Sequence, residues 1–406
     1  MKYCLIGERL GHSYSKIIHN ALGLDYELNE IPVSKIEYFC KNADYNGFNV
    51  TIPYKEKLFE YLYYLSDTAK KIGAVNTVLR KDGKLYGYNT DYDGVLYSFK
   101  KLKVDLKGKT VLILGTGGAS KSVKAVVQDL GATAILVGRT SAVNYQNCYD
   151  YSPQIIVNAT PVGMFPNAGE SPIDLSKFSG VEGVLDCIYN PLKTKLLQDA
   201  DKLNIKNLNG LTMLVRQALK SIEIWTGEKC TDKKTEEVLN DLYKKTLNLC
   251  LVGMPSSGKS AIGKILANRL NKNFIDADEY FFKEYNKTPS QIIEELGEDK
   301  FRELEIKVIS EISQSANSVI ATGGGAVLKE QNISALKSNG KIVYLNRSLD
   351  KLETKNRPLS KKIGVEKLFE TRKSLYEGCA DIEVENNSDI EIAVKRIIEY
   401  YENISN

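Results

Sequence analysis

The sequence lacks the features that mark several classes of protein. It has seven cysteines but no Cys-x-x-Cys pair, so neither a disulfide framework nor a zinc site is expected. No apolar run approaches a membrane span, and the apolar stretch at 3–6 is too brief for a signal-peptide core. The 55 basic residues nearly balance the 51 acidic ones, so nothing indicates a nucleic-acid or membrane partner. We therefore expect a cytoplasmic protein that acts on small molecules.

What the sequence does contain is a regular alternation of short apolar strands and amphipathic helical stretches over its 406 residues. This alternation is typical of an α/β fold with parallel sheets and crossover helices. Two glycine-rich turns lie where a strand passes into a helix, at 115–120 after a strand at 111–114 and at 253–260 after a strand at 249–252. Because the start of a helix binds phosphate well, each half predicts its own nucleotide site.

The first glycine-rich turn is similar to a dinucleotide-binding fingerprint in which Ser120 takes the place of the third glycine. The next strand, at 134–137, leads to Arg139, where an NAD-preferring site would have a carboxylate for the ribose hydroxyl. A guanidinium suits the 2′-phosphate that an acid would repel, so the cofactor predicted is NADP(H). The candidate cofactor-binding residues of this turn and strand end are Gly115, Gly117, Gly118, Ala119, Arg139 and Thr140.

Lys55 and Asp91 are candidates for carbonyl chemistry. Reduction of a ketone puts negative charge on its oxygen as hydride arrives, and a lysine held beside a carboxylate can supply the proton. Lys55 follows a strand expected at 48–52, and Asp91 follows a hairpin that Asp82-Gly83 predicts. Taken singly, each is more often a plain helix start or an N-cap.

Several ordered motifs give residues 1 to 243 a resemblance to shikimate dehydrogenases. The motifs are Gly11-His12-Ser13-Tyr14-Ser15, Asn49-Val50-Thr51-Ile52-Pro53-Tyr54-Lys55-Glu56, Gly73-Ala74-Val75-Asn76-Thr77, Asn89-Thr90-Asp91, Asn158-Ala159-Thr160-Pro161-Val162-Gly163-Met164, Tyr189-Asn190-Pro191 and Leu214-Val215-Arg216-Gln217. The resemblance implies that Lys55 and Asp91 form the catalytic pair and that Asn158 lies on the cofactor side. It also implies substrate contacts by Ser13, Ser15, Thr51, Asn76, Thr90 and Gln217.

The second glycine-rich turn is a full P-loop, Gly-Met-Pro-Ser-Ser-Gly-Lys-Ser at 253–260. Its backbone N–H groups would cradle phosphates, Lys259 would neutralise the β and γ groups, and the Ser260 hydroxyl would bind Mg²⁺. The nucleotide predicted is ATP or GTP, and no Asn-Lys-x-Asp guanine motif occurs. The candidate nucleotide-binding residues are Gly253, Ser256, Gly258, Lys259 and Ser260.

The motifs after the P-loop resemble shikimate kinase in their order, across residues 247 to about 400. They are Asp276-Ala277-Asp278, Phe301-Arg302, Thr322-Gly323-Gly324-Gly325 and Arg357-Pro358-Leu359. The resemblance implies a metal site of Ser260 and Asp276, with Asp278 taking the proton of the substrate hydroxyl. It further implies that the substrate meets Asp278, Arg302, Gly324, Gly325 and Arg372. Lys259 and a lid residue, Arg357, would act on the transferring phosphate.

The sequence thus predicts two α/β units. Residues 1–245 would form a dehydrogenase-like unit, with a substrate lobe at 1–103 and 210–245 and a Rossmann lobe at 104–209. Residues 246–406 would form a P-loop kinase-like unit with a parallel sheet and helices on both faces. The resemblances imply NADPH-dependent reduction of 3-dehydroshikimate to shikimate, then phosphorylation of shikimate with ATP and Mg²⁺. A ligand sensor without catalysis, another substrate such as quinate, and homo-oligomerisation stay open.

Overall fold

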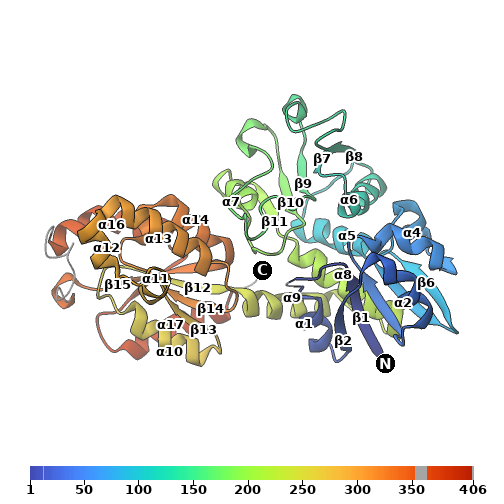
Figure 1. Ribbon diagram of the computed structural model, residues 1–406. Coiled ribbons are helices and arrows are strands. Elements are labelled where there is room, and N and C mark those ends of the chain that lie inside the picture. The colour runs from blue at the N-terminus through green and yellow to red at the C-terminus, as the bar shows by residue number, and fades with distance from the viewer. Residues whose placement is uncertain (12, 353–363, 405–406) are drawn as a thin grey trace. The chain divides into compact units, whose positions relative to one another are not determined.

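The computed structural model describes residues 1–11, 13–352 and 364–404, and the chain divides into two compact units (Figure 1). The first unit consists of Met1–Met164, Glu170–Tyr189 and Leu196–Leu242. The second begins at Tyr243 and also takes in the short segments Phe165–Gly169 and Asn190–Lys195. Within the described ranges, no helix combines the length and apolarity that crossing a bilayer requires.

The substrate lobe of the first unit is built on a six-stranded sheet of order β2-β1-β3-β5-β6-β4. Its strands are β1 (Lys2–Gly7), β2 (Asp25–Glu30), β3 (Gly47–Val50), β4 (Tyr64–Leu65), β5 (Thr77–Lys81) and β6 (Lys84–Tyr88). The expected hairpin joins β5 and β6, and Asp82 (φ 51°) and Gly83 (φ 72°) both have the positive φ that a type I′ turn requires. Strands β1 and β3 run parallel, so the residues that follow β1 lie at the same edge of the sheet as Thr51 and Lys55, which follow β3.

The helices of this lobe are partly drawn from distant stretches of the chain. They are α1 (Ser15–Ala21), η1 (Val33–Lys35), α2 (Ile36–Asn42), α3 (Tyr54–Lys57), η2 (Leu58–Tyr61), α4 (Asp67–Ile72), α5 (Asp91–Leu102), α8 (Leu211–Thr226) and α9 (Asp232–Thr246). Helix α8 comes from beyond the Rossmann segment, and its Trp225 donates to the Val78 carbonyl at 2.9 Å. A Cβ on Gly47 would lie 2.4 Å from the Trp225 indole, so only glycine allows this contact. The return of α8 places Gln217 beside the substrate lobe.

The Rossmann lobe has a parallel five-stranded sheet of order β11-β10-β9-β7-β8. Its elements are β7 (Thr110–Leu114), α6 (Gly118–Asp129), β8 (Thr133–Val137), η3 (Cys148–Asp150), β9 (Ile155–Asn158), η4 (Leu175–Lys177), β10 (Gly183–Asp186), α7 (Lys195–Lys202) and β11 (Lys206–Leu208). Strand β8 pairs with β7 and lies at the edge of the sheet, and the single turn η3 is the helical element between β8 and β9. The glycine-rich turn follows β7 and leads into α6, as expected.

The second unit is a parallel five-stranded sheet of order β13-β14-β12-β15-β16 with helices on both faces (Figure 1). The elements are β12 (Asn248–Val252), α10 (Lys259–Arg269), β13 (Asn273–Asp276), α11 (Ala277–Tyr285), α12 (Pro289–Leu296), α13 (Glu298–Ile312), β14 (Ser318–Ala321), η5 (Ala326–Leu328), α14 (Glu330–Asn339), β15 (Gly340–Asn346), η6 (Leu349–Lys351), α16 (Val365–Cys379), β16 (Ile382–Glu385) and α17 (Ile390–Glu402). In β12, Cys250 and Val252 pack on one face, whereas Leu249 and Leu251 pack on the other. A strand buried on both faces is the reason that this segment reads as a continuous apolar run.

His19 in α1 is a buried histidine of the substrate lobe. Its ring stacks on Tyr26 with centroids 3.9 Å apart, and Nδ1 lies 2.7 Å from the Ser15 carbonyl oxygen. Because a carbonyl only accepts, Nδ1 carries the hydrogen, and Nε2 is buried without a partner in the described part of the chain. Burial lowers the pKa of His19 to about 4.

This burial predicts a pH-dependent stability. The folded pKa lies below the ordinary value, so the stabilisation is present above about pH 6.5 and is lost as the pH falls towards 4. We expect the free energy of unfolding of the first unit to fall by up to about 3 kcal/mol over this range. Urea unfolding followed by the fluorescence of Trp225, the single tryptophan, measures it. His19→Phe keeps a stacked ring and should flatten the pH dependence, whereas an unchanged slope would contradict the assignment.

Candidate active sites

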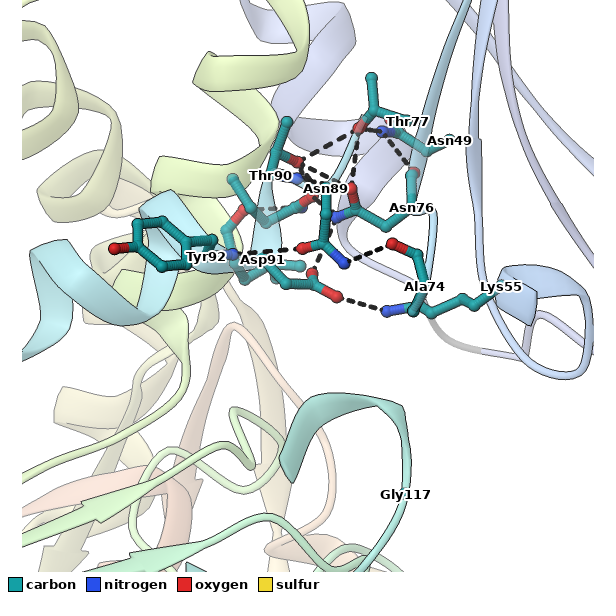
Figure 2. A network of polar contacts seen from close by, with 12 residues as sticks. Asn49, Lys55, Ala74, Asn76, Thr77, Asn89, Thr90, Asp91, Tyr92 and Gly117 are labelled. Atoms are coloured by element: carbon teal, nitrogen blue, oxygen red, sulfur yellow. Dashed lines mark hydrogen bonds and ion pairs between the residues drawn. The ribbon is translucent and has the colours of Figure 1, made fainter. Parts of the chain in front are cut away.

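The centre of the first candidate site is an ion pair between Lys55 and Asp91. Lys55 Nζ lies 2.6 Å from Asp91 Oδ2, and the two side chains are 20% and 9% exposed (Figure 2). Lys55 is on α3, just after β3, whereas Asp91 is the first residue of α5. A carboxylate in the first turn of a helix interacts favourably with the helix dipole. The structure thus brings together the two residues that the sequence singled out.

Asn76 and Thr90 fix the position of Asp91. The Asn76 amide donates to Asp91 Oδ1 at 2.8 Å, and its own oxygen accepts from the Thr90 backbone N–H at 2.7 Å (Figure 2). Thr90 is 1% exposed, and its hydroxyl lies 3.4 Å from Gln217 Oε1. Both carboxylate oxygens of Asp91 therefore accept hydrogen bonds, which offset the cost of burying the carboxylate.

A cavity of about 440 Å³ opens beside this pair, and it holds most of the residues predicted to bind substrate. Ser13, Ser15, Thr51, Asn76 and Gln217 all line it, together with Lys55 and Asp91. Thr90 is not part of the lining, and it helps to position Asn76 by donating its backbone N–H to the Asn76 side-chain oxygen. Hydroxyl and amide groups around one ion pair suit a ligand with several oxygens and a ketone.

The glycine-rich turn lies close to the lysine of the pair. A Cβ placed on Gly118 would lie 3.6 Å from Lys55 Cδ, and Ala119 contributes to the cavity lining. Gly115 has φ 106°, which strongly favours glycine, and Gly117 precedes the first residue of α6 with open space where a side chain would be. A ligand phosphate can therefore approach the backbone N–H groups at this helix start.

Arg139, Thr140 and Asn158 differ in how accessible they are. Arg139 and Thr140 are exposed after β8, so they can reach a phosphate. Asn158, at the end of β9, has no exposure, and its amide donates to Asp186 Oδ1 at 3.1 Å. Its oxygen accepts from the Thr160 backbone at 3.0 Å. Asn158 therefore shapes the loop after β9, and its side-chain atoms are engaged by protein.

The second candidate site is the P-loop at the carboxyl end of β12. Gly253, Ser256 and Gly258 have φ of 149°, 65° and 97°, the curled backbone that turns N–H groups inward. Lys259 is 8% exposed, and its ammonium donates to the carbonyls of Gly253 and Met254 at 2.9 Å each. The lysine thus lies across the mouth of the loop, where nucleotide phosphates would need a cation.

Ser260 and Asp276 adjoin one another at the same edge of the sheet. The Ser260 hydroxyl donates to Asp276 Oδ2 at 2.6 Å, and Asp276 Oδ1 caps α11 by accepting from the Asp278 N–H at 3.0 Å. A hydroxyl and a carboxylate are ligands that suit Mg²⁺ in its usual partly hydrated form. No cluster of three or more His, Cys, Asp or Glu side chains arranged for a metal occurs in the residues that the structure covers.

A pocket of about 90 Å³ lies next to the P-loop, and its lining gathers the residues predicted to hold the second substrate. The lining includes Asp278, Arg302, Gly324, Gly325 and Arg372. Arg302 is 5% exposed and is held by Glu305 at 2.7 Å and by Glu298 at 2.8 Å. Arg372 donates to the Gly324 carbonyl at 3.1 Å. Two arginines at one pocket favour a carboxylate or phosphate ligand.

The triple-glycine segment is explained by protein packing as well as by ligand access. A Cβ on Gly324 would lie 2.7 Å from Pro255 Cδ, and one on Gly325 would lie 2.3 Å from Arg302 Nη2. Glycine at these two positions therefore lets the segment touch the P-loop and the Arg302 guanidinium at the same time. Arg357, the lid residue predicted from the sequence, lies outside the described residues.

Three further side chains belong to these sites although the sequence analysis gave none of them a role there. Glu305 lines the second pocket three residues after Arg302 on α13, and burial raises its pKa despite the neighbouring guanidinium. That i, i+3 spacing was a signal that could have identified it. Tyr189 lines the first cavity and packs against Tyr14. Arg347, which follows β15, donates to the Ser256 carbonyl of the P-loop at 3.4 Å. No local sequence pattern predicts this contact.

Two family models match the chain, one in each unit. Residues 5–78 match the shikimate dehydrogenase substrate binding domain, and residues 255–402 match shikimate kinase. A shikimate dehydrogenase (NADP(+)) of Clostridium perfringens is 40% identical over 264 residues, which cover 59% of this chain and 97% of that protein.

Solved structures give the same result for the first unit. A chorismate mutase/shikimate 5-dehydrogenase fusion protein from Clostridium acetobutylicum has a TM-score of 0.57 at 35% identity, over 60% of this chain and 97% of that chain. A shikimate 5-dehydrogenase from Thermus thermophilus, solved with NADP(H) and shikimate, has a TM-score of 0.54 at 31% identity. That match covers 59% of this chain and 98% of that chain.

Proposed function

Because the chain belongs to the shikimate dehydrogenase family and also carries a shikimate kinase domain, we propose that it catalyses two successive steps of the shikimate pathway. The first unit reduces 3-dehydroshikimate to shikimate with NADPH. The second transfers a phosphoryl group from ATP to shikimate and yields shikimate 3-phosphate. The observation that carries the proposal is that the Lys55–Asp91 cavity and the P-loop with its two-arginine pocket occur in one chain.

In the first reaction Lys55 acts as the general acid. NADPH, when bound at the glycine-rich turn, supplies the hydride, and the residues there fit it because Gly117 leaves open space and Arg139 is exposed. As the carbonyl oxygen gains negative charge, the Lys55 ammonium donates its proton to that oxygen. Asp91 holds the ammonium in place, and Asn76 keeps Asp91 oriented. The other polar groups of the lining hold the substrate carboxylate and ring hydroxyls.

In the second reaction the chain positions a hydroxyl and a phosphate. ATP and Mg²⁺ fit the P-loop because Lys259 crosses its mouth and Ser260 lies against Asp276. Asp278 accepts the proton of the shikimate hydroxyl that attacks, and Arg302 and Arg372 hold the carboxylate of the ring in register. Most of the catalytic effect here comes from positioning and from countercharge, as is general for phosphoryl transfer.

Single lysine replacements should separate the two activities. Lys55→Met removes the proton donor, and we expect at least about a hundredfold loss of 3-dehydroshikimate reduction with shikimate phosphorylation unchanged. Lys259→Met removes the phosphate countercharge and should have the reverse effect, with a loss of similar size. Absorbance of NADPH and coupled detection of ADP, recorded separately on the full chain, measure the two rates.

The same assay decides between the proposal and its alternatives. ADP release that depends on prior reduction of 3-dehydroshikimate supports two steps in one chain. Binding of both nucleotides without turnover would instead indicate a sensor. Faster reaction with quinate than with shikimate in the oxidative direction would reassign the substrate of the first unit.

The contact between Gly325 and Arg302 gives a test within the kinase unit. In Gly325→Ala the new methyl group would force the Arg302 guanidinium away from its place between Glu298 and Glu305. We expect the KM for shikimate to rise about tenfold, the loss of roughly one charge-assisted hydrogen bond, with the KM for ATP little changed. Gly378→Ala on α16 is the matched control, because a Cβ there meets nothing within 4 Å. Equal effects of the two variants would contradict the role given to Arg302.

A further inference from the structure

The cavity of the first unit contains a cation that neither the motifs nor the proposed reaction uses. Arg9 lies between β1 and α1 and contributes to the lining, together with Ser13 and Ser15. Its side chain is exposed and has no hydrogen bond or ion pair with any residue that the structure describes. An arginine that faces a substrate cavity without a protein counterion is available to a ligand anion.

The backbone on either side of Arg9 is held in place. The Glu8 N–H donates to the Ile52 carbonyl at 3.4 Å, and the Leu10 N–H donates to Glu30 Oε1 at 2.8 Å. The Cα of Arg9 is therefore fixed relative to β3, which leads to Lys55, although its side chain is unpaired. A guanidinium on a fixed backbone loses less conformational entropy when it binds a ligand.

Arg9 gives the cavity lining its net charge. The described lining holds three charged side chains: Arg9, Lys55 and Asp91. Lys55 and Asp91 form an ion pair at 2.6 Å and together carry no net charge, so Arg9 leaves the lining with a charge of +1. The substrate of the proposed reaction is a carboxylate, whereas Ser13 and Ser15 offer it only neutral donors. A guanidinium adds a positive charge and can bind a carboxylate through two parallel N–H···O bonds, which a serine hydroxyl cannot do.

We propose that Arg9 binds the carboxylate of the substrate alongside the two serines and thereby sets the preference of the first site for acidic over neutral ketones. The inference rests on the proposed reduction of 3-dehydroshikimate and names the group that recognises its charge. Arg9 takes no part in proton or hydride transfer. Its loss therefore weakens binding in the ground state and the transition state alike, which raises KM and leaves kcat nearly unchanged.

The test compares Arg9→Gln, Arg9→Lys and a matched control in the full chain. Oxidation of shikimate by NADP⁺ without ATP follows the first unit alone, because the kinase is silent. We expect Arg9→Gln to raise the KM for shikimate about tenfold or more, with kcat and the KM for NADP⁺ within about twofold. Arg9→Lys should recover much of the loss. Lys16→Gln removes the same charge from an exposed position on α1 outside the lining and should behave as the parent does.

The methyl ester of shikimate separates charge recognition from a change of shape. It lacks the negative charge, so the parent and Arg9→Gln should oxidise it with equal kcat/KM. An unchanged KM for shikimate in Arg9→Gln, or an equal loss on the ester, would overturn the role of Arg9 while leaving the reaction established. A parent chain that oxidises no shikimate would refute the reaction itself, and the role of Arg9 with it.

Discussion

The first site depends on an ion pair between two partly or fully buried side chains that come from different parts of the chain. Lys55 and Asp91 come from opposite sides of the β5–β6 hairpin, and Asn76 at the start of that hairpin donates to the carboxylate. Removal of any one of the three would leave a buried polar group unpaired, which costs more than the net contribution of the hydrogen bond itself. The geometry of the first site is therefore maintained by the same contacts that stabilise the substrate lobe.

In the second site, the charge of a buried arginine is compensated from within a single helix. Arg302 is nearly buried and is neutralised by Glu298 and Glu305 on its own helix, so its charge is compensated before any ligand arrives. A guanidinium has five N–H donors, and the bonds to the two glutamates use three of them. The remaining donors can bind a carboxylate, while the glutamates fix the plane of the fork. For an anion, the first unit thus offers an exposed arginine that has no partner among the described residues, and the second offers a buried arginine that two glutamates hold in place.

Much of the fold and of the two candidate sites could be predicted from the sequence, because local patterns determine local structure. The P-loop, the β5–β6 hairpin and the strand before each glycine-rich turn are short-range features, and the structure has each of them. The pairing of Lys55 with Asp91 joins residues 36 positions apart, and it came from a family resemblance rather than from spacing. The contact of Arg347 with the P-loop depends on which strands end side by side, and the role proposed for Arg9 depends on how charges cancel in a cavity. Neither can be read from a motif. The resemblance implies cofactor binding by Asn158, and in the structure its buried side chain bonds to Asp186 and to the Thr160 backbone.

Joining these two chemistries in one chain has a thermodynamic consequence that needs no particular arrangement of the units. Reduction of a ketone by NADPH is reversible, and the alcohol formed competes for the same cavity as the ketone. Transfer of a phosphoryl group adds about two negative charges and three acceptor oxygens to that alcohol. In the proposed sequence the reduction forms the 3-hydroxyl of shikimate and the kinase phosphorylates that same oxygen, so the first unit cannot oxidise the phosphorylated product back to the ketone. Phosphorylation therefore removes the product from the first equilibrium, and a single chain supplies the two units in equal amounts.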